Sequence, residues 1–221
     1  MFYNPDWEDM SDYVVHFTKA TETDGKSEYD NMMSIYGSQV LAPGRSFGIG
    51  RKHAPDPNSQ FAVCFSEIPL HHLKRLAERR GPYGIGFTKA LARSRGAEPI
   101  WYLEKGNPTV EAVRALMNRA LCSPDPTGDP IWLLTPFIDS PGEYPTGVYR
   151  FEWEREWRYS GRFEFDEKDV AFLIIPEDLH SAARSFFESA EYQNLGPAYL
   201  CPYIDPQWDR ERVLAALTTI S

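Results

Sequence analysis

The sequence predicts a protein of the α+β class, with a mixed or antiparallel central sheet and flanking helices. Strand-like and helical segments follow one another without regular βαβ alternation, which is typical of this class. Aromatic residues make up 14% of the chain, and 18 prolines indicate many defined turns. A length of 221 residues suits one sizeable core, so we expect a single domain over residues 1–221, with a C-terminal strand and helices in residues 166–221.

Short runs of β-branched, aromatic or apolar residues predict the strands. They occupy residues 13–18, 61–65, 85–87, 99–103, 170–175 and, as two strands about a glycine, 151–165. Apolar residues at helical spacing predict the helices. These occupy residues 28–41, 66–80, 108–122, 177–191 and 210–218. Ser66 is a suitable N-cap for the second helix, and Gly81 is a suitable end for it.

The connection over residues 42–59 contains glycine, proline and basic residues without periodicity. We expect a long loop there, and such a loop in a compact domain is often functional or mobile. Gly84 and Gly86 flank Ile85 in a predicted strand, which indicates close approach of another chain segment. Tyr83, just before them, is available to stack on a planar ring.

Composition and motifs exclude several classes of protein. No apolar run approaches the length of a membrane span, and the first residues are acidic and polar, so we expect a cytoplasmic protein that does not bind membranes. Zinc-ligand spacing, a Walker loop and a GxSxG motif are absent, so no metal site is predicted. Cys64, Cys122 and Cys201 are expected to be reduced, buried thiols.

Charge is unevenly distributed along the chain. The net charge of −9 argues against a general nucleic-acid binder. Residues 71–95 nevertheless carry seven cations and one anion, a local charge of +6 that leaves −15 elsewhere. Arg75, Arg79 and Arg80 in this basic segment are candidate contacts for phosphate or nucleic acid. The alternative is that they form the solvated face and C-terminal end of a helix, where cations suit the helix dipole.

Two further patterns contain candidate catalytic groups. His16 and Thr18 lie two positions apart in a predicted strand, so both point to one face and suit a ribose hydroxyl; the alternative is a half-buried structural histidine. Glu152, Glu154 and Glu156 alternate with other residues, so they too are expected on one strand face. A carboxylate there could stabilise an oxocarbenium ion in a cleft, or simply belong to an exposed face.

Three stretches resemble the AbiGi family of abortive phage-resistance proteins. They are VCFSEIPL from Val63, YGIGFTK from Tyr83 and GAEPIWYL from Gly96, with HFT from His16 and EREWR from Glu154. The resemblance spans roughly residues 13–159. It implies the antitoxin half of a phage-exclusion pair, and therefore a cognate toxin or a phage-derived protein as partner.

The order of motifs also resembles ADP-ribosyltransferases of the DarT type, more loosely. This second resemblance implies an NAD cofactor, with His16 on a ribose hydroxyl and the Phe17 backbone on the carboxamide. It implies that Glu156, or alternatively Glu154, stabilises the oxocarbenium ion. It further implies that Tyr83 or, alternatively, Phe65 stacks on the nicotinamide ring, and that Thr18 also belongs to the NAD-binding residues.

These observations lead to one leading hypothesis and two alternatives. The leading hypothesis is an antiphage-defence protein with an NAD-binding cleft, in which His16 and Glu156 act in ADP-ribosyl transfer or NAD hydrolysis. The first alternative is a non-catalytic antitoxin that neutralises a partner protein. The second is a nucleic-acid-binding module that uses residues 71–95.

Overall fold

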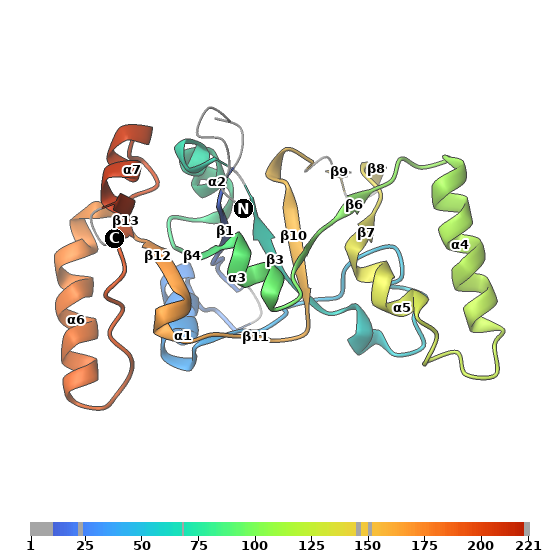
Figure 1. Ribbon diagram of the computed structural model, residues 1–221, viewed down its shortest axis with the longest axis horizontal. Helices are drawn as coiled ribbons and strands as arrows, with labels where there is room; N and C mark the ends of the chain where they lie inside the picture. The colour runs from blue at the N-terminus through green and yellow to red at the C-terminus, as the bar shows by residue number, and fades with distance from the viewer. Residues whose placement is uncertain (1–10, 22–23, 68, 145–146, 150–151, 219–221) are drawn as a thin grey trace. The chain divides into compact units, whose positions relative to one another are not determined.

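The computed structural model describes residues 11–21, 24–67, 69–144, 147–149 and 152–218 (Figure 1). It confirms the α+β class, with helices flanking mixed and antiparallel sheets. The chain forms two compact units, each made of separate segments. The first unit contains residues 1–40, 67–95 and 164–221, and the second contains residues 41–66 and 96–163.

Four strands of the first unit lie side by side in a sheet, in the order β13-β12-β4-β1. They are β1 (Tyr13–Phe17), β4 (Gly84–Thr88), β12 (Val170–Ile174) and β13 (Tyr203–Ile204). β4 is antiparallel to both β1 and β12, whereas β13 is parallel to β12, so the sheet is mixed. β13 is absent from the sequence prediction because two residues give no recognisable period.

The glycines of β4 lie where the prediction expects a close approach. A side chain at Gly86 would overlap the ring of Phe172 on β12, and a Cβ atom at Gly84 would lie 2.8 Å from the backbone oxygen of His16. Burial and β-pairing therefore require glycine at both positions.

Helices of the first unit surround this sheet, and α6 and α7 (orange and red) lie beside β12 and β13 in Figure 1. They are α1 (Glu28–Ser38), α2 (Leu73–Arg80), α3 (Lys89–Ser94), α6 (His180–Tyr192) and α7 (Arg210–Thr218). The side chains of Ser27 and Asp30 form a capping box that starts α1. α1 ends where Gln39 adopts a left-handed conformation with φ of 54°.

The start of α2 differs from the prediction. Ser66 does not cap this helix, because it is the last residue of β3 (Ala62–Ser66). A 3₁₀ turn, η2 (Leu70–His72), precedes α2 instead. The predicted end is correct, since Gly81 follows α2 with φ of 107°.

Three strands of the second unit pair antiparallel to one another, in the order β3-β10-β5. β10 (Glu156–Ser160) pairs with β3 on one side and with β5 (Glu98–Pro99) on the other. The other strands pair two by two: β6 (Trp101–Tyr102) with β7 (Ile138–Asp139), β8 (Gly142–Tyr144) with β9 (Gly147–Tyr149), and β2 (Val40–Leu41) with β11 (Phe163–Glu164).

A separate apolar cluster packs the helices of the second unit. α4 (Pro108–Leu121) presents Val110, Val113 and Met117 to it. Ile131 and Trp132 of the short helix α5 (Ile131–Leu134) complete this contact. α5 leads into the 3₁₀ turn η3 (Thr135–Phe137) and then into β7.

The cysteines are thiols, as expected, but they are not all buried. Cys122 is exposed at the end of α4, whereas Cys64 and Cys201 are partly buried. No helix in the described ranges has both the length and the apolar character needed to cross a lipid bilayer.

Candidate functional site

The first unit brings together several residues of the implied NAD site at the end of β1. The Thr18 amide donates to the Tyr83 carbonyl at 3.0 Å, and Phe17 pairs with Gly84 in the β1–β4 ladder. The Thr18 hydroxyl is buried and donates to the Glu28 carbonyl at 3.0 Å. This hydroxyl is therefore engaged in the attachment of α1 to the sheet.

Tyr83 offers the aromatic surface of this region. Its ring is half-buried and makes an edge-on contact with Tyr29, with 5.9 Å between ring centroids. Burial raises the pKa of Tyr83, and Tyr29 and Asp178 raise it further. The phenol therefore stays neutral at physiological pH.

The three glutamates do not share one strand face, so that prediction is wrong. Glu152–Glu154 form a 3₁₀ turn, η4, and Arg155 has a left-handed φ of 45°. β10 therefore begins only at Glu156. The two alternative carboxylates consequently have different surroundings.

Glu154 is 2% exposed, and one of its carboxylate oxygens accepts a hydrogen bond from the Ser66 hydroxyl at 3.4 Å. Glu156, by contrast, belongs to a network centred on Arg158. The Arg158 Nε donates to Glu156 Oε1 at 2.8 Å, and the Tyr102 hydroxyl donates to Glu156 Oε2 at 3.3 Å. Both oxygens of Glu156 therefore have donors inside the second unit.

Arg158 is fully buried and bonded at all three guanidinium nitrogens. Besides Glu156, it donates through Nη2 to Asp139 at 3.0 Å and through Nη1 to the Pro136 carbonyl at 2.6 Å. The Phe47 ring lies 4.7 Å from its guanidinium carbon. We call Arg158, Glu156 and Asp139 the Arg158 centre.

The electrostatics of the Arg158 centre follow from its pairing. Burial lowers the pKa of Arg158, but Glu156, Cys64 and Asp139 outweigh that effect and raise it. Burial also raises the pKa of the neighbouring Cys64 well above its ordinary value, and Glu156 adds to the shift while Arg158 opposes it. The guanidinium is thus permanently charged, and the Cys64 thiol is protonated at neutral pH.

The implied NAD residues are divided between the two units. His16, half-buried in β1, belongs to the first unit with Phe17, Thr18 and Tyr83, whereas Glu156 belongs to the second. Phe65 also lies in the second unit, where it is 1% exposed and packs against Phe163 with centroids 5.3 Å apart. The Phe65 ring is therefore a core group.

The basic segment carries fewer surface charges than its sequence indicates. Lys89 is buried and pairs with buried Glu67 at 2.7 Å, and Arg95 pairs with Asp169 at 2.8 Å. Arg75 and Arg79 are exposed on α2, and Arg80 is half-buried. The candidate phosphate contacts are thus confined to one short helix.

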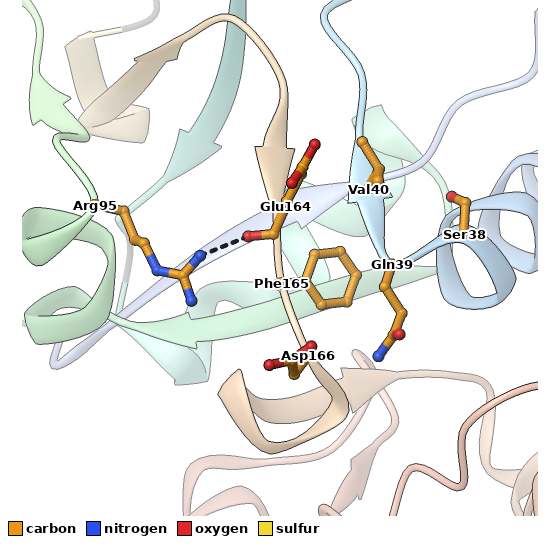
Figure 2. A pocket seen from close by; sticks show the side chains of 7 residues that line it. All are labelled: Ser38, Gln39, Val40, Arg95, Glu164, Phe165 and Asp166. Carbon is orange, nitrogen blue, oxygen red and sulfur yellow. Dashed lines mark hydrogen bonds between the residues drawn. The ribbon is translucent and has the colours of Figure 1, made fainter.

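A pocket of about 320 Å³ lies in the first unit, between α1 and the segment after β11 (Figure 2). Figure 2 shows Arg95 on one side of it and Gln39 on the other. Arg95 donates to the Glu164 carbonyl at 2.9 Å, and the Gln39 amide donates to Glu167 at 3.2 Å. The side chains of Arg95 and Gln39 therefore both have hydrogen-bond partners within the protein.

Sequence reasoning missed Asp139 and Arg51, which belong with the Arg158 centre. Arg51 approaches the second oxygen of Asp139 at 3.7 Å. Asp139 lies in a turn-rich stretch whose local pattern gives no sign of burial. Gly48 and Gly50, which precede Arg51, are a usable signal for a tightly held loop.

The chain was compared with protein families, curated proteins and solved structures. No curated protein and no solved structure matches it. One family model does, described as "Putative abortive phage resistance protein AbiGi, antitoxin", over residues 47–195. The match includes the Arg158 centre and continues past residue 166, and His16–Thr18 lie outside it. Because this match covers more than half of the sequence, the chain belongs to the AbiGi family of abortive-infection antitoxins.

Proposed function

We propose that this protein is a non-catalytic antitoxin that neutralises a cognate toxin by binding it. Family membership supports the antitoxin role. The observation that carries the binding mechanism is the state of Glu156, whose two carboxylate oxygens accept bonds from Arg158 and Tyr102. Glu156 balances the buried charge of Arg158, and this favours a structural role for its carboxylate.

Exposed apolar side chains in the first unit support a protein partner. α6 and the chain after it present four large side chains to solvent. The exposed fractions are 51% for Phe186, 89% for Tyr192, 76% for Leu195 and 67% for Leu200. Apolar and aromatic groups of this kind supply the core of protein interfaces. We place the toxin contact on this α6 surface.

The test is a binding titration with the protein encoded by the adjacent reading frame. We expect co-elution of the two proteins in size-exclusion chromatography. Replacing Tyr192 and Leu195 together with serine should weaken binding at least about tenfold, because interface anchors of this size contribute more than about 1 kcal/mol each. Leu133 and Leu134, exposed on α5 in the second unit, provide the matched double-serine control. Wild-type affinity in the Tyr192/Leu195 double-serine variant would rule out the α6 surface as the toxin contact. Failure to form any complex would rule out the binding mechanism itself.

An NAD-binding site is a second candidate function, with ADP-ribosyl transfer or NAD hydrolysis as its activity. The observation in its favour is the backbone hydrogen bond between Thr18 and Tyr83 in the first unit, close in the chain to half-buried His16. Thermal unfolding with and without NAD tests it. NAD at about one hundred times its Kd stabilises by about 2.7 kcal/mol, which raises Tm by about 5–10 °C in a chain of this size. An unchanged Tm at millimolar NAD would rule out the NAD-binding site.

A further inference from the structure

The long loop of the second unit presents a cluster of three cations and a histidine. Arg45, Arg51, Lys52 and His53 are all exposed. Residues 42–55 contain no aspartate or glutamate. This cluster is separate from the basic helix α2, which belongs to the first unit.

The backbone that carries these cations is fixed by its glycines. Gly48 has φ of +79°, and a side chain there would overlap the carbonyl oxygen of Thr135. A side chain at Gly50 would overlap the Thr135 hydroxyl. The Ile49 amide donates to the Ile138 carbonyl at 2.8 Å, so this part of the loop is held against η3 and β7. The cations therefore project from a preorganised backbone rather than a flexible tether.

Arg45 and Arg51 each contact a residue that also contacts Arg158. The Arg45 guanidinium carbon lies 4.7 Å from the Phe47 ring centroid, and the same ring contacts Arg158. Arg51 approaches Asp139, which also binds Arg158. Two exposed arginines six positions apart are thus linked to one buried centre.

Among the residues that the structure describes, few counter-charges lie near the cations of this loop. Asp139 is the carboxylate near Arg51, at 3.7 Å, and it already accepts a closer bond from Arg158 at 3.0 Å. Within the described part of the chain, the side chains of Lys52 and His53 make no hydrogen bond or ion pair. Cations that have no internal counter-charge are available to an external anion.

We propose that residues 45–53 form a phosphate-binding loop. A phosphate group carries up to two negative charges and three strong acceptor oxygens. Several cations on one short segment therefore bind a phosphate more tightly than they bind a single carboxylate. Arginine forks and a lysine point charge are the usual donors to phosphate. The phosphate belongs either to a nucleotide or to a nucleic-acid backbone. This site is independent of the α6 surface and goes beyond the proposed antitoxin function.

The experiment uses the full chain and three probes: inorganic pyrophosphate, a twenty-nucleotide single-stranded DNA and a glutamate hexapeptide. One variant, R45Q/R51Q/K52Q, removes three charges from the loop. The matched control, K74Q/R75Q/R79Q, removes three charges from α2. Because the loop triple variant alters the Arg51 contact to Asp139, a single Lys52→Glu variant is tested in parallel. This change breaks no side-chain hydrogen bond or ion pair of the described residues.

The loop triple variant should weaken binding of a phosphate probe at least about tenfold, and Lys52→Glu should weaken it too. The α2 control should bind as the wild type does. For the DNA, the slope of log K against log salt should become shallower by about 2, since each lost phosphate contact accounts for about 0.7. Binding of pyrophosphate identifies free phosphates or nucleotides as the source, and binding of DNA alone identifies the nucleic-acid backbone.

Three results would overturn the proposal. The first is no binding of either phosphate probe. The second is an equal loss of affinity in the loop and α2 variants. The third is binding of the glutamate peptide at the loop as tight as that of pyrophosphate, which would identify an acidic protein segment as the ligand.

Discussion

Arg158 is a fully buried cation whose charge is balanced by Glu156 and Asp139. Its guanidinium is well suited to this position, because one planar group serves two carboxylates and a carbonyl at once. Removing one partner of such a centre leaves buried carboxylates without a counter-charge. Removing one partner in this way lowers the free energy of unfolding more than replacing the whole ion pair with well-packed apolar residues does.

We therefore expect Arg158→Met to lower the free energy of unfolding by about 3–5 kcal/mol. Urea denaturation measures this quantity directly. Arg162→Met is the control, since Arg162 is exposed in the same unit and its replacement should change stability by less than about 0.5 kcal/mol. Equal unfolding midpoints for the two variants would contradict the role assigned to Arg158.

At the residue scale, the sequence predicts where a position needs a particular residue type better than it predicts which side chains pair with one another. The prediction of a close strand approach at Gly84 and Gly86 is correct, because a strand position without a side chain leaves room for a neighbouring segment. Lys89, one of the seven cations of residues 71–95, is buried and pairs with Glu67, twenty-two positions away. The pairing depends on tertiary structure, which local charge patterns do not encode.

The loop over residues 47–54 is held by glycines that contact η3. Gly50 has the Thr135 side chain and the Gln60 amide oxygen around the position of a missing Cβ. Gln60 is fully buried, and its side chain also accepts from the Thr135 hydroxyl at 2.9 Å. The loop, η3 and Gln60 therefore form one packed element.

Gly50→Ala should destabilise the protein by about 1–3 kcal/mol through overpacking of this element. Gly44→Ala, in the same connection over residues 42–59, is the matched control, because the added methyl group would meet no atom within 4 Å beyond its chain neighbours. Thermal unfolding of both variants gives the comparison. A Gly50→Ala variant as stable as Gly44→Ala would mean that the loop is not held as described.

One protonated thiol, that of Cys201, and several phenols form a second packed element in the first unit. The Tyr36 hydroxyl donates to the Gly84 carbonyl at 2.8 Å, and the Tyr199 hydroxyl donates to the Tyr36 carbonyl at 2.7 Å. Burial raises the pKa of Cys201 from 9.0 to about 12 and that of Tyr203 from 10.0 to about 12. Burial also raises the pKa of Tyr36 well above its ordinary value.

This arrangement predicts loss of stability in alkali. An acid whose pKa is raised in the folded state loses its proton at a lower pH in the unfolded state. Its contribution to the free energy of unfolding is therefore complete below about pH 8.5 and decreases as pH rises toward about 12. The free energy of unfolding should therefore be level from about pH 7 to 8.5 and then fall. In a C64A/C201A variant the fall should begin only near about pH 10, where tyrosines ionise. An unchanged profile in that variant would contradict the thiol contribution.

Elements with a clear period or cap are predictable from the sequence, and those fixed by tertiary contact are not. The helices predicted over residues 210–218 and 108–122 are confirmed, with α4 ending one residue earlier. The alternation of glutamates before β10 is misleading, because η4 and the left-handed Arg155 interrupt the strand. The Arg158 centre is unpredictable, since it joins residues from β7 and β10.

At the scale of the whole chain, the negative charge is concentrated in one unit. The first unit contains thirteen cations and twenty-one anions, whereas the second contains ten and eleven. Most of the net charge of −9 therefore comes from the first unit. The family match, residues 47–195, includes segments of both units.

The central claim is that the antitoxin role depends on binding and not on catalysis by His16 and Glu156. Growth rescue tests it most directly: cells arrested by the toxin from the adjacent reading frame receive the wild type, His16→Ala, Glu156→Gln or the Tyr192/Leu195 double-serine variant. Soluble amounts and Tm are checked for each, because Glu156 belongs to the Arg158 centre. We predict rescue by folded His16→Ala and Glu156→Gln and impaired rescue by the double-serine variant. Loss of rescue in both folded single variants, with full rescue by the double-serine variant, would contradict the claim.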